Sequence, residues 1–366
     1  MSDWGRLERV LEEVVSGAAA PGIVAGCWQG GECRVSLARG FLSSEQGDRK
    51  VTLGTLYDLA SLTKAVCTAP LVWLRVQSGE WGLADRLDDF FPELKGEPQG
   101  AITLEQLLRH TSGYPAIIRM DQMDANGPEG AYHLAKFTPL ENEPGRVVCY
   151  SDVGYLVLGH LLETESRKGL DELFQSEIAE PLGADVPSFR PNGVGPAATN
   201  GIAATSVPEG FLRPLYGVVE DENTRFLGGV SGSSGLFGTI DQLANLVLEF
   251  RRCWMGTGRL FSRQFLESVW AVSPDPTGNT WTAGWDTPSD TGSTAGRYFS
   301  LESVGHLGFT GTSLWYDRRS DVIALVLSNR VCPTRSNPRF GPFRAKIHDT
   351  IMEVLGYTDP RPRRYP

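Results

Sequence analysis

The chain has 366 residues, of which 41% are hydrophobic and 21% are charged, and its formal net charge is −10. This composition is typical of a soluble globular protein with a sizeable core, and it excludes a fibrous or disordered chain. The acidic balance disfavours nucleic acid or an anionic membrane as a partner, because both attract basic surfaces.

The N-terminal residues predict an amphipathic helix rather than an export signal. Its apolar positions recur with helical spacing after a possible cap at Ser2 or Asp3: Trp4, Leu7, Val10, Leu11 and Val14. The segment lacks a basic start followed by an apolar core, and no run of about 18 apolar residues occurs in the chain. We therefore expect a cytoplasmic protein without a transmembrane span.

Residues 22–43 alternate apolar and small side chains around a Gly-Gly pair, a pattern typical of an antiparallel hairpin. A helix is then expected at 61–78, with Gly79 as a suitable C-terminal cap. Pro70 lies inside this helix and should kink it or remove one backbone hydrogen bond.

The middle of the chain has mostly helical patterns, broken by Pro/Gly loops. Residues 191–214 are rich in Gly, Pro, Ala and Thr, and they are expected to form a long loop or a few short strands. The remaining expected elements are two helices, two strand segments and a final helix: 239–254, 263–272, 303–317, 321–331 and 343–356.

Strand-rich chain ends with a helical middle predict an α+β fold. We expect an antiparallel sheet flanked by terminal helices, plus an inserted all-helical domain. Residues 1–60 and 225–366 are expected to form the sheet domain, and residues 61–224 the mainly helical domain.

Ser61 and Lys64 form the only Ser-x-x-Lys sequence in the chain. Residues three apart on a helix project from one face, and a lysine whose pKa is lowered by burial can accept a serine proton. The neighbouring residues are apolar, which favours burial, and a helix N-terminus offers backbone N–H groups to an oxyanion. The alternative is a serine cap followed by an incidental surface lysine.

Two further motifs follow in the chain. Tyr-Ser-Asp at 150–152 precedes an amphipathic helix, and His-Leu-Gly at 306–308 lies on a late strand. With the motif at 61–64, they resemble the serine β-lactamase and penicillin-binding-protein-like superfamily, in its class C-like, esterase-containing branch. That superfamily carries Ser-x-x-Lys, Tyr-x-Asn and Lys-Thr-Gly in this order, and the similar segments span roughly residues 55–335.

The resemblance implies a β-lactamase-like fold and a role for each matching residue. Ser61 is the acylated nucleophile and Lys64 the base that activates it, while Tyr150 shares the base role or protonates the leaving group. The backbone N–H groups of Ser61 and Phe309 form the oxyanion hole. Attack of water on the acyl-enzyme then completes hydrolysis.

The second motif departs from the family pattern, because Asp152 stands where many relatives have Asn. An ionised carboxylate beside Lys64 favours the ammonium form and weakens that lysine as a base. Either Asp152 is neutral, or Lys64 acts mainly as a cation that lowers the pKa of Tyr150.

The third motif departs as well. His306 and Leu307 replace the Lys-Thr pair that helps to hold substrate carboxylates in relatives, while Gly308 is retained. We expect this triplet to contact the substrate but to anchor a carboxylate poorly. Arg330 or Arg335 can supply a replacement cation, or both are surface arginines.

Other candidate residues carry weaker signals. His110 is expected to brace a loop rather than to act in a triad. The serines at 233–234 lack Gly-x-Ser-x-Gly spacing, which disfavours an α/β-hydrolase. The acidic run at 218–229 either lines the pocket mouth or forms a solvated loop. Trp281 and Trp285, in a Gly/Thr-rich segment, are expected to contact substrate.

The sequence therefore predicts a serine hydrolase with its active site in a cleft between two domains. An esterase or amidase acting on a small acyl substrate is favoured. The alternatives are a β-lactamase, a D-alanyl-D-alanine carboxypeptidase or D-aminopeptidase, an acyltransferase, and a catalytically silent scaffold. The expected partner is a small ester, amide or β-lactam-like molecule. No metal or cofactor is expected, because the chain lacks a metal-spaced His cluster, a P-loop and a dinucleotide motif.

Overall fold

The two ends of the chain form one antiparallel sheet with the strand order β2-β1-β8-β7-β6. The structure is a computed structural model that describes residues 3–45, 49–123, 125–190, 201–208, 211–272, 279–362 and 364. The strands of this sheet are β1 (Gly22–Gln29), β2 (Glu32–Gly40), β6 (Ser303–Leu307), β7 (Ser313–Asp317) and β8 (Val322–Ser328). The predicted hairpin at 22–43 is confirmed, because β1 and β2 pair antiparallel across the Gly-Gly pair.

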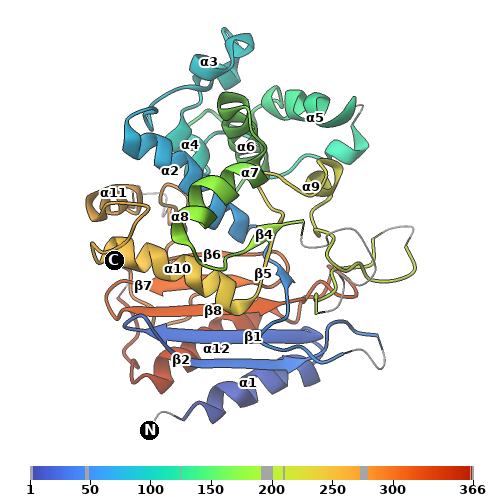
Figure 1. Ribbon diagram of the computed structural model, residues 1–366, viewed down its shortest axis with the longest axis vertical. Helices are drawn as coiled ribbons and strands as arrows, with labels where there is room; N and C mark the ends of the chain where they lie inside the picture. Colours follow the sequence, from blue (N-terminus) through green and yellow to red (C-terminus); the bar gives the residue numbers. More distant parts are fainter. Residues whose placement is uncertain are drawn as a thin grey trace.

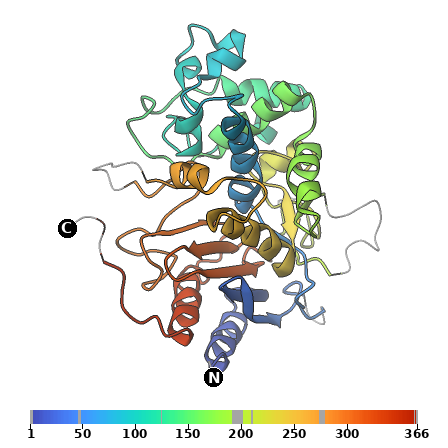
Figure 2. The same cartoon turned by 60° about the vertical axis from the view of Figure 1, so that its left-hand side comes forward.

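Helices cover both faces of the sheet. On one face Ala25 and its strand partner Val326 pack with α1 (Gly5–Ser16) and α12 (Gly341–Val354). On the other face Val24 and its partner Leu327 share a core with α10 (Ile240–Trp254). Successive strand residues point to opposite faces, so a strand with two covered faces is apolar at nearly every position. Figures 1 and 2 place α1 and α12 at the end of the molecule opposite the cyan and green helices.

The first helix begins close to the predicted position. Asp3 Oδ1 accepts the Gly5 N–H at 3.2 Å, which satisfies one of the unpaired donors at the helix start. Ser2, the other expected cap, lies outside the described residues. The helix buries the apolar residues that the spacing predicted: Leu7, Val10, Leu11 and Val14.

The middle of the chain is helical, as predicted (Figure 1). Its α-helices are α2 (Ala69–Ser78), α3 (Leu87–Phe90), α4 (Leu104–Leu108), α5 (Gly127–Lys136), α6 (Asp152–Ser166), α7 (Leu170–Phe174), α8 (Glu180–Leu182) and α9 (Glu222–Phe226). One further helix, α11 (Arg263–Val269), follows α10. Short 3₁₀ and π turns join them: η1 (Lys64–Thr68), η2 (Pro92–Leu94), η3 (Pro98–Ala101), η4 (Met120–Gln122) and η5 (Gln175–Ala179). Ten successive residues of α6 are buried, so α6 is the central helix of this part.

A small second sheet carries the chain into the first motif. Its strands are β3 (Tyr57–Asp58), β5 (Leu236–Gly238) and β4 (Ser188–Phe189), in that spatial order. The expected loop or short strands at 191–214 fall partly outside the described residues, and Ile202 and Ala204 form isolated bridges. Ser61 lies three residues after the end of β3, so this small sheet positions the start of the motif.

The helix predicted at 61–78 differs at its start. A π turn, η1, precedes α2, and Pro70 lies in the first turn of α2, where a missing N–H is tolerated. The predicted cap is confirmed: Gly79 has φ 79°, and its N–H bonds to the carbonyls at the end of α2. Lys64 is the first residue of this π-helical turn and follows the turn that contains Ser61.

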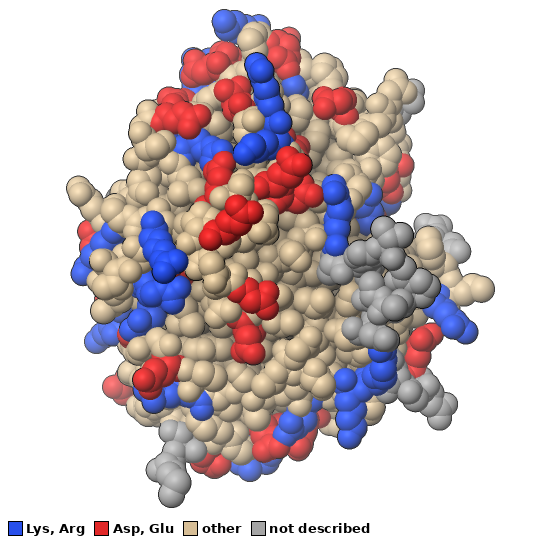
Figure 3. Space-filling model, viewed as in Figure 1, with Lys and Arg blue, Asp and Glu red and all other residues tan. Residues whose placement is uncertain are grey.

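The surface carries both signs of charge. Figure 3 shows acidic and basic side chains interspersed with uncharged surface over the face viewed. Among the described residues, no helix combines the length and the apolar character needed to cross a bilayer.

Candidate active site

Ser61 lies in a turn that side chains hold in a strained conformation. Ala60, just before it, has φ 49°, and its N–H donates to Asp58 Oδ1 at 2.8 Å. The Thr63 hydroxyl donates to the Ala60 carbonyl at 2.7 Å. A positive φ is costly for a residue other than glycine, so these contacts stabilise a conformation that an isolated chain avoids. The turn presents Ser61 to a cavity.

Asp58 joins this turn to a second segment. Its side chain is 3% exposed, and Oδ2 accepts the Glu220 N–H at 2.7 Å. Burial raises the pKa of Asp58 to about 7. The folded protein therefore binds a proton at Asp58 at pH values where the unfolded chain does not, so its stability falls as the pH rises from about 4 to 7.

We predict that the stability difference between the wild type and Asp58→Asn shrinks between pH 5 and pH 8, by about 2–3 kcal/mol. The variant loses one acceptor for a backbone N–H, but it does not titrate. Urea unfolding at several pH values measures this difference. A difference that stays constant or grows with pH would contradict a raised pKa at Asp58.

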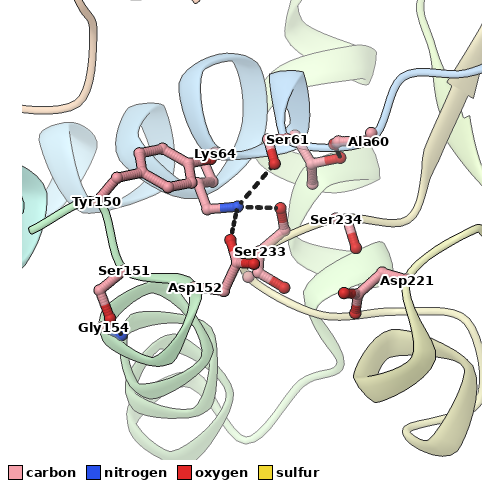
Figure 4. A network of polar contacts seen from close by, with 12 residues as sticks. Ala60, Ser61, Lys64, Tyr150, Ser151, Asp152, Gly154, Asp221, Ser233 and Ser234 are labelled. Atoms are coloured by element: carbon pink, nitrogen blue, oxygen red, sulfur yellow. Dashed lines mark hydrogen bonds and ion pairs between the residues drawn. The ribbon is translucent and has the colours of Figure 1, made fainter. Parts of the chain in front are cut away.

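Lys64 is 0% exposed, and two hydrogen-bond acceptors and one carboxylate surround its ammonium group. Its Nζ donates to Ser61 Oγ at 3.1 Å and to the Ser233 carbonyl at 2.7 Å, and it lies 2.7 Å from Asp152 Oδ1. Figure 4 shows these contacts converging on Nζ from the turn at Ser61, from the start of α6 and from the segment before β5. This geometry favours the charged form of Lys64.

The electrostatic surroundings of Lys64 and Tyr150 bear on the role of the second motif. Burial opposes the charge on Lys64, but Asp152 and Tyr150 outweigh it and raise the pKa of Lys64. Burial also raises the pKa of Tyr150, and the Lys64 charge offsets this only in part. The Lys64 charge does act to lower the pKa of Tyr150, as one of the two expectations states. The effect of burial is larger, so the pKa of Tyr150 is raised overall. The resting site therefore holds an ammonium and a neutral phenol.

His110 holds the segment that carries Tyr150. The Ser151 N–H donates to His110 Nδ1 at 3.1 Å, and the His110 ring lies 4.5 Å from the Tyr150 ring and 4.5 Å from the Trp281 ring, between centroids. Burial lowers the pKa of His110 well below its usual range, so the ring is neutral. The expectation that His110 braces a loop agrees with these contacts.

The third motif lies on β6 at the cavity wall. His306 is 1% exposed, and its Nδ1 lies 2.8 Å from the Leu307 carbonyl oxygen, which places the ring proton on Nδ1. Nε2 is then an acceptor, and it has no hydrogen-bond partner among the described residues. Burial and the Lys64 charge lower the pKa of His306 to about 3, so this ring is neutral as well.

Two backbone N–H groups are free at the cavity. Neither Ser61 N nor Phe309 N donates to an acceptor in the described part of the chain, and both residues line the cavity. Gly308 permits this approach, because a Cβ there would collide with Thr312 Oγ1 and lie 2.7 Å from the Leu59 carbonyl oxygen. The end of β6 is thereby packed against the nucleophile turn, with the two donors at one site.

A cavity of about 500 Å³ brings most of the predicted site residues together. The predicted residues that line it are Ser61, Lys64, Tyr150, Asp152, Trp281, His306, Leu307, Gly308, Phe309, Arg330 and Arg335. Trp285 does not, and its predicted substrate contact is wrong. Its side chain is 0% exposed, and the indole N–H donates to the Ala65 carbonyl at 3.0 Å. Gly284 lets this segment pack closely against Trp73 of α2, which buries Trp285.

The remaining lining residues were not predicted, apart from the acidic run. Glu220 and Asp221 line the cavity, as one of the two expectations for that run held, whereas Glu222 begins α9. The unpredicted lining residues are Ala60, Ala116, Ile117, Ser233, Ser234, Asp286 and Arg344. Of these residues, only the two serines could have been found from the sequence. They lie in a Gly/Ser-rich run at 231–235, and glycine turns allow main-chain carbonyls to approach other groups closely.

Comparison with known proteins places these motifs in one family. The family model described as Beta-lactamase matches residues 7–348. A protein of Salmonella agona (strain SL483), named "Putative D-alanyl-D-alanine carboxypeptidase", is 28% identical over 320 residues. That alignment covers 80% of this chain and 73% of the relative.

Solved structures of similar fold cover almost the whole chain. A class C beta lactamase from Rhodobacter sphaeroides has a TM-score of 0.74 at 19% identity, covering 96% of this chain and 99% of its own. EstCE1, described as a hydrolase with promiscuous acyltransferase activity, has a TM-score of 0.75 at 19% identity, covering 95% of this chain and 97% of its own. At these identities the likeness concerns the fold, and it confirms the predicted α+β class.

Proposed function

The chain belongs to the beta-lactamase family, whose members are serine hydrolases, and on this premise we propose that it hydrolyses a small ester or amide through an acyl-enzyme on Ser61. One observation carries the proposal: Lys64 Nζ lies 3.1 Å from Ser61 Oγ at the wall of a cavity with two free backbone N–H groups. A nucleophile, a proton-transfer group and oxyanion donors are the parts that acyl transfer needs.

Each step assigns a proton and a bond. The pair formed by Lys64 and Tyr150 first loses one proton to solvent, which leaves it able to act as a base. Ser61 Oγ then attacks the substrate carbonyl and gives up its proton to this pair. The carbonyl oxygen becomes an oxyanion, which accepts from the N–H groups of Ser61 and Phe309. The bond to the leaving group then breaks, and Tyr150 or Lys64 returns the proton to that group. Water repeats the sequence on the acyl-enzyme and releases the acid.

The third motif supports a substrate without a carboxylate at this position. His306 is neutral and offers a lone pair at Nε2, and Leu307 is apolar. A carboxylate needs donors or positive charge, so both residues anchor it poorly. His306 Nε2 instead suits an N–H or O–H donor on the leaving group.

Two observations favour a second candidate, a peptidase or β-lactamase that takes carboxylated substrates. The Salmonella relative carries the name of a D-alanyl-D-alanine carboxypeptidase. Arg330 also lines the cavity and forms no ion pair among the described residues, whereas Arg335 lies 3.3 Å from Glu220. Acyl transfer to an acceptor other than water uses the same acyl-enzyme, as the description of EstCE1 illustrates for that protein.

The division of the chain also remains our proposal, with residues 1–60 and 225–366 in the sheet domain and residues 61–224 in the helical domain. We further propose a cytoplasmic location and a small-molecule substrate, without a nucleic acid or membrane partner. Cell fractionation tests the location.

Steady-state kinetics test the proposed substrate class. The panel contains p-nitrophenyl butyrate, a penicillin, an N-acyl-D-alanyl-D-alanine and the matched carboxamide of that dipeptide. We expect hydrolysis of the ester and a kcat/KM for the carboxamide at least about tenfold above that for the carboxylate. Faster hydrolysis of the carboxylate or rapid turnover of the penicillin would instead support the second candidate. If the protein hydrolyses none of these compounds and a fluorophosphonate probe does not label Ser61, the scaffold alternative is the one that remains.

A further inference from the structure

Two arginines hold the short turn that follows β6. Arg344, in α12, donates from Nη2 to the Gly308 carbonyl at 2.6 Å, and Gly311 N donates to the same oxygen at 3.1 Å. Arg330 donates from Nε to the Phe309 carbonyl at 2.7 Å. The carbonyl oxygens of two consecutive residues are therefore both bound to guanidinium groups.

The Gly308 carbonyl and the Phe309 N–H belong to the same peptide group, which is trans. In a planar trans peptide the C=O and N–H bonds point in opposite directions. A guanidinium on the oxygen therefore turns the Phe309 N–H away from Arg344. That N–H has no acceptor among the described residues, and Gly308 and Phe309 both line the cavity. The cation also draws electron density toward the oxygen, which makes the N–H a stronger donor.

The charges of these two arginines are unbalanced in the resting structure. Neither Arg344 nor Arg330 forms an ion pair within the described residues, whereas Arg335 pairs with Glu220 and Glu222. Burial and the Arg330 charge lower the pKa of Arg344 to about 10, so it is still charged at pH 7. Unpaired charges with restricted access to water are costly, and they are commonly retained where a reaction or ligand supplies the opposite charge.

We propose that Arg344, supported by Arg330, is a positioning residue: it orients and polarises the peptide between Gly308 and Phe309, so that its N–H stabilises the oxyanion of the tetrahedral intermediate. This inference rests on the proposed function, because it assumes acylation of Ser61. The negative charge that develops during the reaction balances the two arginines. The interaction strengthens only as that charge forms, so it accelerates the reaction rather than binding the substrate more tightly.

The test compares Arg344→Met, Arg344→Lys and a matched control, Arg361→Met. Arg361 is also partly buried, forms no ion pair among the described residues and donates to main-chain carbonyls, including Ser289 at 2.6 Å, but it does not line the cavity. The readouts are kcat and KM for p-nitrophenyl butyrate, the Ki of a phenylboronic acid, and the melting temperature. A boronic acid forms an anionic tetrahedral adduct with serine, so its Ki reports on the oxyanion site.

We expect Arg344→Met to lower kcat about 10- to 100-fold and to raise the boronate Ki by a similar factor, with KM within about threefold of the wild type. Arg344→Lys should have a kcat between those of Arg344→Met and the wild type. If the methionine variant does not fold, the lysine variant is compared with the wild type instead. Arg361→Met should leave kcat and Ki unchanged.

Two results would overturn the inference. A higher KM with unchanged kcat would mean that Arg344 binds substrate directly. Unchanged kcat and Ki would mean that Arg344 has only a structural role. Failure of the proposed function is distinguishable from both, because then the wild type would neither hydrolyse the ester nor react with a fluorophosphonate at Ser61.

Discussion

Lys64→Met should lower kcat/KM for p-nitrophenyl butyrate by at least about 10³-fold, because Ser61 loses the group that accepts and returns its proton. The same change leaves Asp152, whose side chain is 22% exposed, without its cation. Removing one partner of a mostly buried ion pair destabilises a protein by roughly 3 kcal/mol. The single variant therefore mixes a catalytic effect with a structural one.

The double variant Lys64→Met/Asp152→Asn separates the two effects. A neutral pair of similar volume should restore most of the stability lost in the single variant, but none of the activity. Asp152→Asn alone serves as the matched control, because it keeps Lys64. Urea unfolding and ester kinetics measure both quantities. Activity within about tenfold of the wild type in the double variant would assign the proton transfer to Tyr150 alone.

Asp152→Asn should shift the pH dependence of kcat/KM toward lower pH. In the wild type, Asp152 raises the pKa of Lys64 against the opposing effect of burial. Neutral Lys64 therefore becomes abundant only at alkaline pH, and activity should rise into that range. Without the carboxylate, the effect of burial on Lys64 is less compensated and its pKa falls, so activity reaches its plateau earlier, by roughly 1–3 pH units.

The pH profile of ester hydrolysis, corrected for the spontaneous reaction, measures this shift. Asp185→Asn is the control, because Asp185 accepts from Gln242 at 2.9 Å on an exposed surface outside the cavity. Its profile should match that of the wild type. If the profiles of Asp152→Asn and the wild type also coincide, Asp152 does not control the protonation of Lys64.

Local sequence patterns predicted those parts of the fold that depend on neighbouring residues. The alternation at 22–43 predicted the hairpin, because a strand places successive side chains on opposite faces. Gly79 predicted a helix end, because a left-handed residue there is best formed by glycine. The spacing of Ser61 and Lys64 predicted their contact, since one helical turn brings such residues together.

Contacts between distant segments left no such pattern. The Ser233 carbonyl accepts from Lys64 across 169 positions, and a main-chain acceptor has no residue signature in the sequence. Nothing in the sequence around Arg344 distinguishes it from other residues of the last helix. It reaches the Gly308 carbonyl only because α12 packs beside the end of β6. The net directions of the pKa shifts of Lys64 and Tyr150 could not be predicted either, because they depend on how the effect of burial compares with that of the neighbouring charges.

Trp285 illustrates the opposite error. A tryptophan in a segment rich in glycine and threonine suggests an exposed loop near a binding site. In the structure its ring lies 5.5 Å from Trp270 and 5.4 Å from Phe250, between centroids, inside an aromatic core. Trp281, four residues earlier in the same segment, lines the cavity. The composition of this segment correctly indicated that it lies near the cavity. Only its packing against α2 determines that Trp281 lines the cavity and that Trp285 is buried.

The central claim is that Ser61 forms the acyl-enzyme, and labelling with a fluorophosphonate probe tests it most directly. Intact-mass spectrometry followed by peptide mapping should find a single adduct on Ser61 in the wild type and none in Ser61→Ala. Labelling of Lys64→Met should be at least about 10³-fold slower. An adduct on another residue, or one that persists in Ser61→Ala, would contradict the account.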